Sequence, residues 1–213
     1  MKFAARTCTA ALGGLLIAGV GLAAVAEEQH GEDQGVDVNV SIATLEEPGV
    51  LAMTVASDSV ALTETTASDP AVRQFEGTLP EVTVTDTRTA DETPEGAWWY
   101  VVGQASDFSG AGTIPAANLG WAPQLTGDDS NGLIAEGEET FPALDTDAAP
   151  DNVGLKGKEL LALTLDSVGA AEERTGSWTA QAALTLQTPV DQTPGDYASV
   201  LTLSLWEDIA TAP

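Results

Sequence analysis

The sequence predicts an all-β fold, an antiparallel β-sandwich of about eight strands with one long excursion rich in Gly, Pro and acidic residues. Apolar and polar residues alternate with a period of two in most segments long enough to form a strand. Clusters of Gly, Pro, Asp and Thr separate these segments and indicate turns. Strands with one apolar and one polar face are typical of antiparallel sheets that pack face to face.

The expected strands follow one another along the chain, and the segment 97–102 is apolar on both faces, which favours a central position. The segments are 36–42, 51–55, 59–62, 82–84, 97–102, 161–165, 178–187 and 197–205. Residues in the apolar phase of these strands form the predicted core. They include Val82, Val84, Leu163, Leu165, Leu184, Leu186, Leu201 and Leu203.

The stretch 107–153 lacks this alternation and is the predicted excursion. It offers at most a brief strand near Leu133 and one helical turn within 114–120, with Pro115 at the first position of that turn. A long excursion inside a domain is usually either functional or disordered, and the sequence does not distinguish the two.

Composition excludes several functions. The 213 residues carry a formal net charge of −26, with only seven Lys and Arg residues, so no basic surface for nucleic acid can form. One Cys and one His are too few for a Cys/His metal site. The hydrophobic content of 43% is sufficient for a core, and the length fits a single domain.

The first 26 residues have the pattern of a secretory signal peptide. Lys2 and Arg6 precede an uncharged, mostly apolar run that ends in Ala24-Val25-Ala26, the small residues that a signal peptidase requires. The alternative is a retained membrane anchor, for which the run is short. We therefore expect secretion, with no membrane span after cleavage. Residues 27–35 are expected to form a flexible acidic lead-in, and residues 36–213 a single sandwich domain.

The sequence contains no enzyme signature. The only His, His30, lies in the predicted lead-in, where a base that needs neighbours to hold it is poorly placed. With 33 acidic residues, a pair of carboxylates at the spacing of a glycosidase occurs by chance and says little. The protein is expected to be non-catalytic.

A short acidic loop is the one candidate metal site. Asp128, Asp129 and Asn131 supply the clustered oxygens that Ca²⁺ prefers, although no Glu stands where the last ligand of an EF-hand belongs. The same residues are also typical of a tight turn. No other cofactor is expected.

The aromatic residues are few and clustered. Trp98 and Trp99 are adjacent, so in a strand they point to opposite faces; either one lies in the core and the other is exposed, or covering layers bury both. Tyr197 precedes the last strand, where it is expected to hydrogen-bond nearby backbone as a tyrosine corner.

Four segments occur in an order that resembles the WxL-like surface proteins of Gram-positive bacteria, over about residues 79–206. They are 79–88, 99–108, 114–121 and 183–205. Val101 replaces the Leu of the first Trp-x-Leu segment, and Leu203-Ser204-Leu205 stands where the second is expected. The resemblance implies non-covalent attachment to the cell wall through peptidoglycan.

The leading hypothesis is therefore a secreted, wall-associated protein whose partner is a cell-wall glycan. Its candidate binding residues are Trp99, Val101, Phe108 and Trp121, whose aromatic members could stack on sugar rings. The alternative is a secreted structural or adhesive subunit that binds another surface protein by pairing an exposed strand edge. An acidic enzyme that acts on glycans is a third and weaker hypothesis.

Overall fold

The computed structural model describes residues 47–127, 129–173 and 176–210. The predicted signal peptide, the lead-in with His30 and the strand expected at 36–42 lie outside the described residues. All the described residues fall within one compact unit, which is described here by itself.

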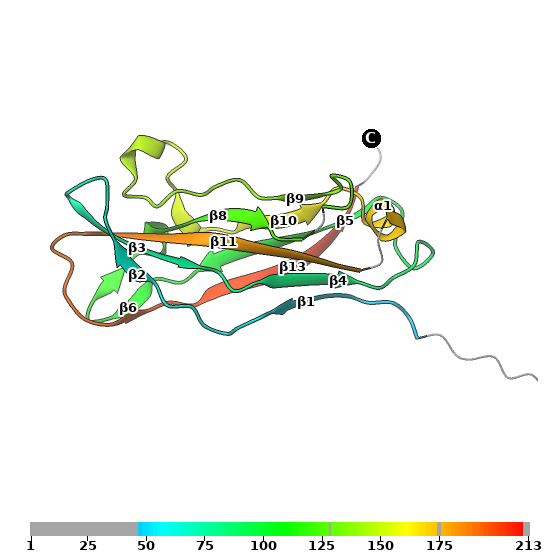
Figure 1. Ribbon diagram of the computed structural model, residues 1–213, viewed down its shortest axis with the longest axis horizontal. Helices are drawn as coiled ribbons and strands as arrows, with labels where there is room; N and C mark the ends of the chain where they lie inside the picture. Colours follow the sequence, from blue (N-terminus) through cyan, green and yellow to red (C-terminus); the bar gives the residue numbers. More distant parts are fainter. Residues whose placement is uncertain (1–46, 128, 174–175, 211–213) are drawn as a thin grey trace, which may run out of the picture. The chain divides into compact units, whose positions relative to one another are not determined.

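The first sheet, sheet A, is built around the longest strand, β11 (Figure 1). β8 pairs with one side of β11, while β3 and β4 pair with its other side, one after the other along its length. β1 and β2 pair in turn with β4 and β3 and form the edge. These strands are β1 (Leu51–Val55), β2 (Thr63–Thr65), β3 (Val72–Thr78), β4 (Val82–Asp86), β8 (Leu119–Leu125) and β11 (Gly176–Pro189).

The second sheet, sheet B, has the order β13-β5-β10-β9, and a small third sheet has the order β12-β6-β7. Every pairing is antiparallel. The strands are β5 (Ala97–Ala105), β6 (Phe108–Gly110), β7 (Thr113–Ile114), β9 (Ile134–Glu136), β10 (Glu159–Thr164), β12 (Tyr197–Ala198) and β13 (Leu201–Ile209). The all-β, sandwich-like fold predicted from the sequence is confirmed.

Among the described residues, helical structure is limited to short pieces. They are α1 (Ser167–Glu173), η1 (Ala116–Asn118), η2 (Thr146–Ala148) and η3 (Gly154–Lys156). The helical turn expected within 114–120 is η1, and Pro115 caps its start. Over the described ranges, none of the helices has the length and apolar character needed to cross a membrane.

The core lies between sheets A and B, and its apolar residues come from both. Val82, Val84, Leu184 and Leu186 are buried as predicted, while Leu201 and Leu203 are partly buried against the same cluster. Trp99 and Trp178 meet in this core with ring centroids 5.7 Å apart. Burial of such large rings supplies much of the stabilisation available to a small sandwich.

Two predicted core residues do not face the core. Leu165 is 66% exposed and Leu163 is only half-buried, because the pairing of β10 with β5 shifts between Leu160 and Ala162. A bulge of this kind inserts one residue and reverses which face the following side chains occupy. Ala162 and Thr164 therefore point inward, and Leu163 points outward.

The stretch 107–153 contains more regular structure than expected, because it includes β6, β7, β8 and β9. The expectation of at most a brief strand was wrong. The apolar residues of β8 do not alternate: Leu119, Gly120 and Trp121 are all buried. β8 pairs with β11 on one side and forms only the isolated bridge from Trp121 to Thr140 on the other, so Pro123 lies at an edge, where Pro is tolerated.

Two further differences lie near the start of the described chain. β3 was not predicted, since its apolar Val72 and Phe75 are three residues apart and Gly77 follows. The strand expected at 59–62 is instead a connection, and β2 follows it. The edge strand of sheet A is thus interrupted between β1 and β2.

The tyrosine corner is confirmed. The hydroxyl of Tyr197 donates a hydrogen bond to the carbonyl oxygen of Thr193 at 2.6 Å and accepts one from Nε2 of Gln192 at 2.8 Å. These bonds fix the chain at the entry to β12.

Candidate functional site

The four residues predicted to bind the wall are all buried. Trp99 is 1% exposed, and Val101, Phe108 and Trp121 lie in the same core cluster. Trp121 packs its ring against Gly103, where a Cβ atom would lie only 2.6 Å from the ring. A sugar ring cannot stack on side chains that the two sheets cover, so the assignment of these residues as the binding surface was wrong.

The residues of opposite phase on β5 lie on the outer face of sheet B. Trp98 and Tyr100 point away from the core and stack on each other, with ring centroids 4.9 Å apart and an interplanar angle of 26°. One Trp of the adjacent pair is therefore buried and the other half-buried at the surface. This is one of the two arrangements that the sequence left open.

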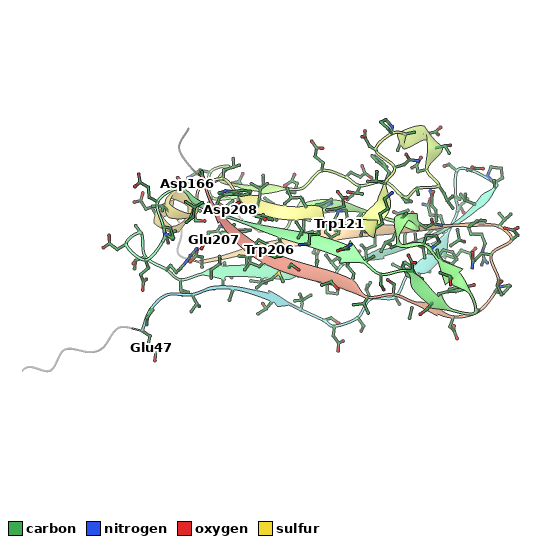
Figure 2. The ribbon with its side chains drawn as sticks, turned by 180° about the vertical axis from the view of Figure 1, so that it is seen from behind. Glu47, Trp121, Asp166, Trp206, Glu207 and Asp208 are labelled. Carbon is green, nitrogen blue, oxygen red and sulfur yellow. The ribbon has the colours of Figure 1, made fainter. Side chains whose placement is uncertain are left out.

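Strand β13 adds a third aromatic residue to this face. Trp206 lies opposite Tyr100 in the β13–β5 ladder, and directly opposite residues in an antiparallel pair point to the same face. Trp206 is 45% exposed, and Figure 2 labels it on β13. We call Trp98, Tyr100 and Trp206 the aromatic platform. On its other side, Leu163 of β10 lies opposite Tyr100 and extends the apolar surface.

Two lysines border the aromatic platform. Nζ of Lys158 lies 4.4 Å from the centroid of the Trp206 ring, a cation–π contact. The carbonyl oxygen of Lys156 accepts a hydrogen bond from Nε2 of Gln104, which belongs to the outer face of β5. Within the described residues, Arg73 and Arg88 form ion pairs, whereas Lys156 and Lys158 form none. The aromatic platform thus has the ammonium group of Lys158 over one of its rings.

One carboxylate lies at the far end of the same face. Asp208 is opposite Trp98 in the ladder, and its Oδ1 accepts a hydrogen bond from the backbone N–H of Ile209 at 2.8 Å. The platform therefore carries an acid beside Trp98 and the ammonium group of Lys158 over Trp206.

The predicted calcium loop has a structural role in the part that the structure describes. Ser130 and Asn131 have positive φ angles of 49° and 58°, and Ser130 is buried. The Ser130 Oγ accepts a hydrogen bond at 2.8 Å from the indole N–H of Trp178, so the turn anchors a core side chain. Asp128 lies outside the described residues. Among the described residues, no group of three or more His, Cys, Asp and Glu side chains is placed to hold a metal ion.

Sequence reasoning missed the platform for an identifiable reason. The segment 97–102 is apolar on both faces, so its pattern does not reveal which Trp faces inward. The useful signal was the phase of Trp206, which follows the alternating leucines of β13 by one residue and so belongs to the opposite face.

Comparisons with known proteins return no match: no family model, no curated protein and no solved structure is significantly similar to this chain.

Proposed function

We propose that the protein is a secreted, non-catalytic surface protein that associates non-covalently with the cell wall by binding glycan on the aromatic platform. The observation that supports this most directly is the gathering of Trp98, Tyr100 and Trp206 on one outer sheet face. Aromatic rings at a surface present flat apolar area, and an exposed patch of this kind marks an interaction site. The resemblance to WxL-like proteins points to peptidoglycan as the ligand.

The charge of the protein makes the position of the lysines important. A net charge of −26 repels anionic wall polymers over roughly a Debye length, about 8 Å at physiological ionic strength. Lys158 offsets that repulsion locally at the aromatic platform. Peptidoglycan carries carboxylates on its peptide stems, and such a carboxylate could pair with a lysine while a sugar stacks on Trp206.

The test is binding of the purified protein to isolated peptidoglycan. Trp206→Ala and Trp98→Ala should each weaken binding about tenfold or more, which corresponds to ~1.4 kcal/mol. Trp206→Phe should retain part of the affinity, since a smaller ring remains. Lys158→Gln should weaken binding more at low salt than at high salt, because exposed charges are screened.

Val190→Ala is the matched control, because Val190 is an exposed apolar residue in the turn after β11, outside sheet B. Its affinity should equal that of the unmodified protein. If the Trp variants keep their thermal stability and also keep full affinity, the platform is not the binding surface and the proposal fails.

A further inference from the structure

The two sheets are joined on one side of the sandwich and separate on the other. Beside β8, Trp121 pairs with Thr140, so the segment that follows β9 closes that side. On the opposite side lie the two edge strands β1 and β13, each paired with a single neighbour. Nη2 of Arg88 ties this side together at one end by an ion pair with Glu207 at 2.7 Å (Figure 2 labels Glu207).

Beyond that ion pair lies an open cavity of about 960 Å³, lined by apolar and polar side chains. Its lining includes the connection 57–62 and the segment 192–200. Side chains from β1, β3, β6, β11 and β13 form its walls, among them Met53, Phe75, Phe108, Leu184, Leu186 and Leu203. Val55 and Val200, which also line it, are 39% and 67% exposed.

The open edge of β1 carries unpaired backbone groups beside this cavity. Ala56 N–H donates to the Glu81 carbonyl at 2.9 Å, and Thr87 N–H donates to the Val50 carbonyl at 3.0 Å. Hydrogen-bonded pairs alternate along an antiparallel ladder, so the even-numbered residues of β1 bond to β4. Met53 and Val55 therefore direct their N–H and C=O groups to the open side.

β13 also has an open edge. Ser106 N–H donates to the Val200 carbonyl at 2.9 Å, and Ala210 N–H donates to the Gly96 carbonyl at 2.8 Å. Leu201 and Leu203 thus direct their backbone groups away from β5 while their side chains line the cavity. Natural edge strands usually carry charges or Pro that prevent pairing, but β1 reads Leu-Ala-Met-Thr-Val and has neither.

Charge decides which occupant this site suits. Asp58 and Asp196 line the cavity, and no cation pairs with either among the described residues, whereas the lining residue Arg73 is paired with Glu64. A second copy of the chain would bring another net charge of −26 to these unpaired carboxylates. A chain with basic residues is therefore the complementary occupant.

We propose that the open side of the sandwich binds an extended segment of a partner protein as an added strand on the edge of β1. The segment carries apolar side chains at alternate positions, which enter the cavity, and basic residues at the end beyond Val55, which face Asp58 and Asp196. Strand addition supplies affinity through backbone hydrogen bonds and specificity through the side-chain cavity. The site is distinct from the aromatic platform, so each can fail without the other.

The probe is a synthetic peptide of alternating Val and Thr with two Lys residues at each end. It should bind the purified protein in a fluorescence anisotropy titration, and the amides of Met53 and Val55 should then gain protection in hydrogen exchange. Val55→Pro removes an edge N–H without breaking the β1–β4 ladder and should weaken binding at least tenfold. Val55→Thr, which keeps the N–H, should bind much more tightly than Val55→Pro. Val190→Ala, outside the lining of the cavity, is the control and should bind like the unmodified protein.

Asp58→Asn combined with Asp196→Asn should weaken binding of the Lys-flanked peptide and reduce its salt dependence, while a Glu-flanked peptide should bind poorly to the unmodified protein. Three outcomes would overturn the proposal. In the first, the amides of Met53 and Val55 are already protected in the free monomer. In the second, the protein forms a concentration-dependent dimer that protects the same amides. In the third, the fatty acid dodecanoate displaces the peptide from the cavity and the edge amides gain no protection. Equal binding by Val55→Pro and Val55→Thr would also overturn it.

Discussion

Neighbouring residues of this chain have different roles because a strand alternates its faces. Trp99 is buried against Trp178, while Trp98 stacks on Tyr100 at the surface. The residue types were evident in the sequence, but their assignment to a face was not, since both faces of β5 are apolar. Tyr197 was easier to predict, because its role depends on its position before a strand and requires no knowledge of the facing sheet.

Two glutamates illustrate how local contacts set pH dependence. Hydrogen bonds from the N–H and hydroxyl groups of Thr89 and from Gly49 N–H lower the pKa of Glu92. Ionised Glu92 stabilises the fold fully above its pKa in the unfolded chain, near 4.5. This stabilisation is lost as the pH falls through its lower pKa in the folded protein. Desolvation raises the pKa of Glu159, partly opposed by a hydrogen bond from Thr140, so ionised Glu159 destabilises the fold as the pH rises through its raised pKa.

Glu92→Gln and Glu159→Gln should have opposite effects on the free energy of unfolding. At about pH 7, Glu92→Gln should lower it and Glu159→Gln should raise it. Both differences should shrink when urea unfolding is repeated at about pH 2.5, where the carboxyls are protonated in folded and unfolded chains alike. Effects of the same sign, or effects that persist in acid, would contradict these assignments.

At the scale of elements, alternation predicted strands well where one face is apolar and failed where a local feature interrupts it. β4, β11 and β13 follow their apolar phase. The bulge in β10 turns Leu163 and Leu165 away from the core, and Gly120 and Pro123 interrupt the alternation that would have predicted β8. A bulge depends on the partner strand, and an edge position depends on the whole sheet. Neither is visible in a single segment of sequence.

Packing of β8 across the sandwich against β5 requires a glycine at position 103, which has no side chain. A Cβ atom on Gly103 would lie 2.6 and 2.8 Å from two ring carbons of buried Trp121 and 3.2 Å from Leu203. Gly103→Ala should therefore destabilise the protein by about 1–3 kcal/mol through overpacking, measured by urea unfolding. Gly157→Ala is the control, because its Cβ would meet only Glu159 Oε1 at 3.5 Å. Equal stability of the two variants would show that the Trp121 ring moves freely.

At the scale of the whole molecule, acidic residues outnumber basic ones by 33 to 7, and this imbalance governs how stability responds to salt. Like charges repel in the compact state, and the repulsion is strongest at low ionic strength. Salt also weakens ion pairs, yet the pair of Arg88 with Asp86 is mostly buried and is screened less than surface charges are. Repulsion should therefore dominate the response.

We accordingly expect NaCl to stabilise the protein. Raising NaCl from about 10 mM to about 500 mM shortens the Debye length from roughly 30 Å to below 8 Å, so the urea midpoint should rise while the slope of the unfolding free energy stays constant. Choline chloride at equal ionic strength should give the same rise, because screening does not depend on the identity of the cation. A rise confined to NaCl would indicate specific cation binding instead. A fall in the midpoint would show that attractive ion pairs outweigh the net repulsion of the acidic chain.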